Sequence, residues 1–266
     1  MTDPLEDFTR GSFSYRGVAH DVFRSGEGPA VIVIAEIPGI TPQVADFARK
    51  VRAIGCTVLL PVLFGEPGRE MSGGYAAKSF GAACVSREFA AFATRKTAPI
   101  AEWLRALARY AHDSFGGPGV GAIGMCFTGG FALGMMADEH VIAPVLSQPS
   151  LPLPPIAKKA KRSVQLSDDD LRIVKDRVAD GICVLGLRFT EDIAVPADRF
   201  ETLRRELGDG FIGVEIDSSD GNPWGISKRA HSVLTEHFVD QPGHPTREAL
   251  DQVLEFFRIR LVEPVS

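Results

Sequence analysis

The chain has 266 residues, of which 45% are hydrophobic and 24% charged, and its formal net charge is −5. This balance is typical of a folded globular protein, so it excludes extensive disorder, and it argues against a nucleic-acid-binding surface. The basic run at residues 158–162 is short and indicates a solvated loop. The longest apolar run, residues 30–35, is too short to span a membrane. We expect one domain over residues 1–266, without a membrane or nucleic-acid partner.

Strand and helix patterns alternate along nearly the whole chain. Apolar β-branched runs, typical of strands buried on both faces, alternate with stretches whose apolar residues recur at helical spacing. The predicted strands are residues 29–35, 56–61, 120–123, 141–146, 182–187 and 211–216, preceded by edge strands or a hairpin over 12–24. The predicted helices are residues 41–54, 81–94, 97–113, 131–137, 167–178, 196–207 and 246–260. This alternation predicts an α/β fold, with a mostly parallel, doubly wound sheet and helices on both faces.

Three longer segments interrupt the alternation. Residues 62–80 are rich in glycine and polar side chains and are predicted to form a loop. Residues 147–180 exceed a plain strand-to-strand connection and include a predicted helix, so they predict an insertion or lid. Residues 217–230 form another long loop, which carries Trp224. Both later segments follow strands, so we expect them at the carboxyl edge of the sheet, where they could shape a pocket.

The segment from Gly124 to Gly130 has the pattern of a nucleophile elbow, with Cys126 in the place of the nucleophile. An apolar strand pattern precedes it and a helical pattern follows it. A sharp turn at this junction exposes the side chain at the edge of the sheet, and flanking glycines let strand and helix pass closely. The amino end of the following helix favours a thiolate. A glycine-rich joint with a structural cysteine is the alternative.

A nucleophilic cysteine needs a base, and the base needs an orienting group. In α/β-hydrolases the order along the chain is nucleophile, acid, histidine. Asp192, in the loop after strand 182–187, is the predicted acid, and Glu191 is its local rival. His231, between the last strand and the last helix, is the predicted base. His237, a partly exposed residue, and His244, a surface turn residue, are the other candidates after that strand.

Four segments together resemble the dienelactone hydrolase family of α/β-hydrolases. They are Glu36-Ile37-Pro38-Gly39, Gly124-x-Cys126-x-x-Gly129-Gly130, Asp192-x-x-Val195-Pro196 and Ala230-His231-Ser232. They occur in the order of the family, and the resemblance covers about residues 12–260. It implies the α/β-hydrolase fold and a triad of Cys126, His231 and Asp192.

The resemblance also implies roles for residues near the first buried strand. In the family, the carboxylate at the position of Glu36 contacts the resting cysteine and helps to manage its proton. A carboxylate at a buried strand end is costly unless it is paired, which agrees with such a role. The alternative is an acid that caps the helix near Thr41. The backbone N–H groups of Ile37 and Phe127 are expected to form the oxyanion hole.

One position departs from the family pattern. Lactone-cleaving members bind a substrate carboxylate with arginines, and one of these stands four residues after the catalytic histidine, where this chain has Thr235. Arg87 and Arg69 lie in the region of the other arginine. A dienelactone substrate is therefore not implied. Trp224 and Phe127 are further candidates for lining the pocket.

These observations predict a hydrolase that cleaves a small carboxylic ester or lactone through an acyl-enzyme. We expect neither metal nor cofactor, because no histidine has metal-ligand spacing. A non-catalytic ligand-binding protein and a thiol redox sensor are the rival functions, although a sensor would want a resolving cysteine beside Cys126. The four cysteines lack a disulfide framework, and the first residues lack a signal-peptide pattern, so we expect a cytoplasmic protein.

Overall fold

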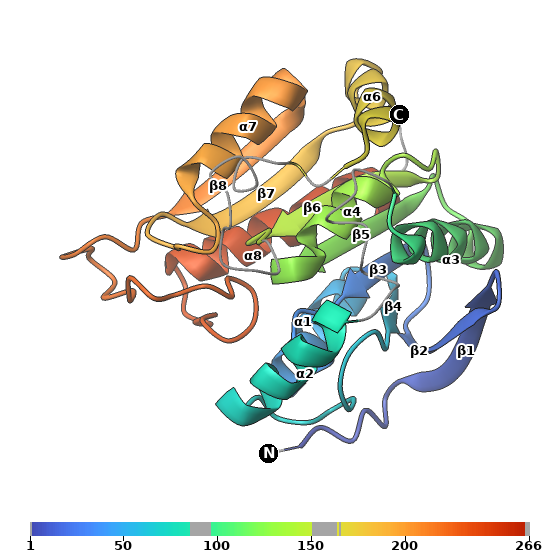
Figure 1. Cartoon of the computed structure of the whole chain (residues 1–266), viewed down its shortest axis with the longest axis horizontal. Helices are drawn as coiled ribbons and strands as arrows, with labels where there is room; N and C mark the ends of the chain where they lie inside the picture. The colour runs from blue at the N-terminus through green and yellow to red at the C-terminus, as the bar shows by residue number, and fades with distance from the viewer. Residues whose placement is uncertain (1, 86–96, 151–163, 165, 264–266) are drawn as a thin grey trace.

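The computed structural model describes residues 2–85, 97–150, 164 and 166–263. An eight-stranded sheet crosses the molecule in the order β1-β2-β4-β3-β5-β6-β7-β8 (Figure 1). The strands are β1 (Thr9–Tyr15), β2 (Val18–Ser25), β3 (Ala30–Ile34), β4 (Thr57–Pro61), β5 (Val120–Met125), β6 (Val141–Ser147), β7 (Val184–Phe189) and β8 (Phe211–Ile216). β1 and β2 pair as an antiparallel hairpin, β2 pairs antiparallel with β4, and the remaining pairs are parallel.

Helices pack on both faces of the sheet. Side chains from α3, α4, α6 and α7 join one hydrophobic cluster, and side chains from α1 and α8 join the other. The helices are α1 (Pro42–Ala53), α2 (Gly73–Val85), α3 (Pro99–Phe115), α4 (Gly129–Met135), α6 (Asp168–Ala179), α7 (Ala197–Leu207) and α8 (Pro245–Phe257). The predicted α/β fold, with its mostly parallel doubly wound sheet, is therefore confirmed.

Several local predictions need correction. The loop predicted over residues 62–80 ends early, because residues 73–80 belong to α2, whose first turns carry glycine and alanine rather than a clear apolar stripe. The rest of the helix predicted over 81–94 lies partly outside the described residues. His244 is buried rather than a surface turn residue, because its Nδ1 accepts the N–H of Thr246 and caps α8. Cys183 precedes β7 and is half-buried.

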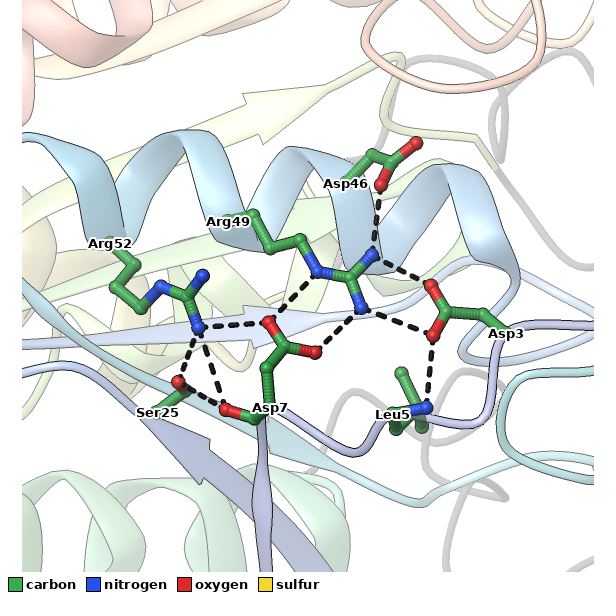
Figure 2. Close-up of polar contacts among 7 residues, drawn as sticks. All are labelled: Asp3, Leu5, Asp7, Ser25, Asp46, Arg49 and Arg52. Atoms are coloured by element: carbon green, nitrogen blue, oxygen red, sulfur yellow. Dashed lines mark hydrogen bonds and ion pairs between the residues drawn. The ribbon is translucent and has the colours of Figure 1, made fainter.

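The segment before β1 is fastened to α1 by charge. Arg49 of α1 binds the carboxylates of Asp3, Asp7 and Asp46, and Arg52 binds Asp7, as Figure 2 shows. We call residues 2–8 the N-terminal strap. Its Leu5 and Phe8 side chains enter the hydrophobic cluster that α1 covers. The strap therefore closes one end of that cluster.

Membrane-spanning character is absent from the described helices. None of them is both long enough and apolar enough to cross a bilayer.

Candidate active site

Cys126 lies in a strained turn between β5 and α4. Its φ angle is +55°, a left-handed conformation that non-glycine residues adopt rarely and that is enriched at functional sites. A Cβ atom on Gly124 would lie 2.1 Å from the carbonyl oxygen of Thr128, and one on Gly129 would lie 2.7 Å from Cβ of Pro149. Glycine is thus required at both positions by close approach, as the elbow pattern predicts.

Thr128 fixes the elbow to the neighbouring strand. Its buried hydroxyl donates to the carbonyl oxygen of Ile34 at 2.8 Å, and it accepts the N–H of Met125 at 2.8 Å. These bonds join the turn to the end of β3. Sequence reasoning missed this threonine, because a threonine inside an elbow has no distinguishing local pattern.

Asp192 and His231 meet at the carboxyl edge of the sheet. Asp192 follows β7 and His231 follows β8, and Oδ2 of Asp192 lies 2.6 Å from Nδ1 of His231. The other carboxylate oxygen of Asp192 accepts the N–H of Ala194 at 2.9 Å. Since Asp192 is buried and held by its own loop, it fixes the imidazole through Nδ1 and leaves Nε2 for Cys126.

The loop that carries Asp192 is supported by a buried arginine. Arg188 of β7 donates through one terminal nitrogen to the carbonyl oxygen of Val195 at 2.7 Å and through Nε to Glu215 of β8 at 2.8 Å. Arg188 thus ties the acid loop to the sheet. No sequence pattern distinguished Arg188 from other residues of the predicted strand.

His231 is strongly basic in this setting. Burial acts to lower the pKa of His231, but hydrogen bonds with Asp192 and Cys126, together with their charges, outweigh burial and raise its pKa to about 11. The imidazole is therefore a cation at neutral pH. An imidazolium next to a cysteine favours the nucleophilic thiolate.

Glu36 is buried two residues after the end of β3, and neutral groups donate hydrogen bonds to its carboxylate. Ser232 donates to Oε2 at 2.6 Å, Gln148 donates to the same oxygen at 3.3 Å, and Thr235 donates to Oε1. One donor atom each of Glu36, Cys126 and His231 lies within 4.8 Å of the others. The predicted neighbourhood of Glu36, Cys126 and His231 therefore forms, and the hydrogen bonds of Glu36 hold the loop that follows His231.

Thr235, expected in the substrate pocket, thus binds Glu36 in the position of a family arginine. Its side chain is buried, so the site gains a neutral donor where the family pattern has a cation.

A turn after β6 contributes two side chains to the site, and their contacts were not predicted. Gln148 adopts a left-handed φ of +34° and bonds Glu36, while its Oε1 accepts the N–H of Val233 at 3.2 Å. Two residues on, the Ser150 hydroxyl lies 3.0 Å from Sγ of Cys126. The sequence predicted an insertion or lid over residues 147–180 but not these contacts, because the partners of this turn lie far away along the chain.

The remaining predicted residues that the structure describes have contacts with other side chains. The ring of Phe127 is buried and packs against those of Phe64 and Phe131, so it belongs to the core. Trp224 is 42% exposed, and its ring contacts His244. Arg87 lies outside the described residues.

Three further candidates bond no side chain of the proposed triad among the described residues. Arg69 pairs with Glu66 at the surface. The backbone N–H of Glu191 donates to the hydroxyl of Ser218, and Nδ1 of His237 accepts the N–H of Ser232. Asp192 and His231 are therefore the acid and the histidine that the structure brings together.

Within the described ranges, one group of three histidine, cysteine or carboxylate side chains is close enough to share a metal ion. It consists of Glu36, Cys126 and His231. Their existing bonds point to different chemistry. Both oxygens of Glu36 already accept hydroxyl donors, and His231 is paired with a carboxylate. A nucleophile, a base and an orienting acid in this order can perform acyl transfer.

Comparisons with known proteins find a family model that covers most of the chain. The model of the dienelactone hydrolase family matches residues 18–258. None of the curated proteins compared with the chain matches it.

Solved structures share the fold at low sequence identity. A dienelactone hydrolase from Anabaena variabilis is 18% identical, with a TM-score of 0.61 over 96% of this chain and 100% of that chain. Est1E from Butyrivibrio proteoclasticus is 13% identical, with a TM-score of 0.58 over 94% and 98% of the two chains. A dienelactone hydrolase-like promiscuous phosphotriesterase from metagenomic libraries is 14% identical, with a TM-score of 0.57 over 96% and 98%.

Proposed function

Because the chain belongs to the dienelactone hydrolase family and is a hydrolase, we propose that it cleaves a small carboxylic ester or lactone through Cys126, His231 and Asp192. The observation that carries this proposal is the 2.6 Å bond between Asp192 and His231, with Cys126 close to the same imidazole. Three residues from separate loops would not align in this way for packing alone.

The reaction has two halves. The Cys126 thiolate attacks the carbonyl carbon, and the electron pair of the C=O bond moves to oxygen. When the tetrahedral intermediate collapses, the C–O bond to the alcohol breaks and His231 gives its proton to the leaving oxygen. In the second half, His231 takes a proton from water, hydroxide attacks the thioester, and the thiolate leaves. Asp192 orients the imidazole and stabilises its charge throughout.

The proposed oxyanion hole uses backbone donors. The N–H groups of Ile37 and Phe127 follow β3 and Cys126, so both come from the carboxyl edge of adjacent parallel strands. Glu36 is proposed to help to manage the proton of the Cys126 thiol, from a carboxylate held in place by its hydroxyl partners. Arg87 and Trp224 stay candidates for contacts with substrate.

The proposed substrate class includes several kinds of ester. Thr235 replaces a cation, which favours esters and lactones without a carboxylate of their own. A triester of phosphate belongs in the screen, because one structural neighbour is named a phosphotriesterase. The free thiols of Cys56, Cys126 and Cys183 fit the inferred cytoplasmic setting.

A panel of chromogenic short-chain esters, lactones and a phosphotriester tests the proposal. We expect hydrolysis by the wild type and a loss of at least about 10³-fold in Cys126→Ala and in His231→Ala. His237→Ala is the matched control, because Nδ1 of His237 accepts the backbone N–H groups of His231 and Ser232 but, among the described residues, bonds no side chain of the proposed triad. Circular dichroism checks that each variant is folded.

The same panel separates the rival functions. Binding of an ester without turnover would support a ligand-binding protein. Loss of signal on oxidation, with no hydrolysis before it, would support a thiol sensor. Near wild-type hydrolysis by Cys126→Ala would reject the proposed nucleophile.

A further inference from the structure

A serine hydroxyl contacts the proposed nucleophile from an element that carries none of the triad. Ser150 lies in the turn after β6 and is only 2% exposed, and its Oγ is 3.0 Å from Sγ of Cys126. His231 reaches the same region from the loop after β8. Among the described residues the sulfur therefore has three polar neighbours, Ser150, His231 and Glu36, supplied by three different loops.

The position of this hydroxyl is fixed by backbone bonds. The N–H of Ser150 donates to the carbonyl oxygen of Cys126 at 2.9 Å, and the N–H of Gln148 donates to that of Leu187 at 2.7 Å. Pro149, between them, packs so closely on Gly129 that a Cβ there would overlap it. A donor held in this way costs little further entropy when it serves the reaction.

The direction of the hydrogen bond follows from the charge of the site. Within the part of the chain that the structure describes, the Cys126 sulfur is the one partner of the Ser150 hydroxyl. His231 is a cation at neutral pH, since its pKa is raised to about 11 by Asp192 and Cys126 against the effect of burial. The neighbouring sulfur is then favoured as a thiolate, which has no hydrogen to give. Beside a thiolate, the hydroxyl is the donor.

We propose that Ser150 is a further catalytic residue, whose hydroxyl donates a hydrogen bond to the Cys126 thiolate. The bond stabilises the charged sulfur before attack. It weakens when the C–S bond forms and the negative charge passes to the carbonyl oxygen. It re-forms when the C–S bond of the thioester breaks and its electron pair returns to sulfur, so Ser150 also assists the departure of the thiolate.

Other titratable groups lie near the sulfur, and they could also affect its pH dependence. His231 and Glu36 lie beside Cys126, and Asp192 and His237 lie beside His231. A serine does not titrate, so replacing it leaves the charges of those four groups in place. A change in the pH dependence of the sulfur would therefore report the lost donor.

The test is the rate of alkylation of Cys126 by iodoacetamide between pH 4 and pH 10, followed by mass spectrometry of its peptide. In Ser150→Ala we expect the midpoint of the low-pH limb to rise by about one to two pH units, as for loss of a hydrogen bond to a charged group. The alkylation rate below that midpoint then falls at least about tenfold. Ser150→Gly, which also lacks the hydroxyl, should shift in the same direction.

Thr202→Val is the matched control, because it removes a buried hydroxyl on α7 that bonds the carbonyl of Asp198. Its midpoint should equal that of the wild type. Cys56, whose pKa is raised to about 11 by burial, serves as an internal unreactive thiol. Thermal melts confirm that the variants compared are folded.

An unchanged midpoint in folded Ser150→Ala and Ser150→Gly would overturn the proposal, and a lowered midpoint would show that the hydroxyl accepts from a thiol instead. The inference rests on the proposed function only through the role of Cys126 as nucleophile. Alkylation reports the sulfur whether or not an ester is turned over. A shifted midpoint with no hydrolysis by the wild type would thus keep the hydrogen bond and reject the hydrolase reaction.

Discussion

His231 owes its charge to two side chains that come from different loops. Oδ2 of Asp192 lies 2.6 Å from Nδ1 of His231. The sulfur of Cys126 also raises the pKa of the imidazole. Burial alone would lower the pKa of this half-buried imidazole. The cation therefore depends on both partners and should weaken when either is neutralised.

An NMR titration of His231 measures this dependence. We expect the pKa of His231 to lie near 11 in the wild type and to fall in Cys126→Ala and in Asp192→Asn, because each change removes a hydrogen bond and a negative charge. The raised pKa also stabilises the fold. That stabilisation is full below about pH 6.5 and is lost as the pH rises toward 11. The melting temperatures of wild type and Asp192→Asn should therefore converge between those pH values.

The order of thiol reactivity follows from exposure and charge. Cys126 is partly exposed beside a cation, whereas Cys56 is fully buried, and burial raises its pKa to about 11. Limited labelling with iodoacetamide should modify Cys126 first and leave Cys56 intact. Cys183, half-buried ahead of β7, should react between them. Labelling of Cys183 before Cys126, with or without an added ester, would contradict a nucleophilic elbow.

At the scale of elements, two of the three glycines of α4 have opposite surroundings. Gly129 faces Pro149 in the turn after β6, where an added Cβ would lie 2.7 Å from the proline Cβ. At Gly134 the nearest atom to an added Cβ is a terminal methyl of Leu166 at 3.5 Å, an ordinary contact. The same helix thus offers a strained and an unstrained site for the same substitution.

Gly129→Ala should destabilise the protein by about 1–3 kcal/mol, because the overlap must be relieved by moving backbone. It should also displace the turn with Ser150 and lower the alkylation rate of Cys126. Gly134→Ala should be neutral or stabilise by up to about 1 kcal/mol, since alanine favours the helix. Chemical denaturation of both variants measures the difference. Equal stability would mean that the turn after β6 yields more easily than its close packing indicates.

Local patterns sufficed for part of this site. Adjacent glycines make the elbow at Cys126 recognisable in the sequence. Strand and helix periodicity predicted Asp192 after β7 and His231 after β8, where they lie. Ser150 and Gln148 could not be found in this way, because their partners Cys126 and Glu36 lie 24 and 112 residues away along the chain. Serine and glutamine are also ordinary residues in loops, so only the folded arrangement distinguishes them.

At the scale of the whole molecule, the N-terminal strap has its largest set of ion pairs with Arg49, and Arg52 adds one to Asp7. Arg49 binds three carboxylates, two of which belong to the strap, as Figure 2 shows. Hydrogen bonds from Arg49, against a smaller effect of burial, lower the pKa of Asp7 from 3.8 to about 2. The ion pairs that bind Asp7 of the strap to α1 thus require an ionised Asp7 carboxylate.

Arg49→Met should lower the free energy of unfolding by about 1–2 kcal/mol at pH 7, because a partly buried network is lost rather than one exposed pair. Because the folded pKa of Asp7 is lowered, its contribution is full above pH 3.8 and is lost as the pH falls toward 2. The difference between wild type and variant should shrink across that interval in urea melts. Arg172→Met, which removes an exposed pair with Asp169, is the control and should change little.

The site is assembled from distant stretches of chain, and this has a kinetic consequence. Asp192 and His231 are 39 residues apart, and Glu36 and Ser232 are 196 apart. Contacts of such long range form late, because each must first overcome the entropy of closing a large loop. During refolding, helical signal should therefore return well before esterase activity. Newly synthesised chains would pass through a compact stage in which the thiol of Cys126 exists without its partners.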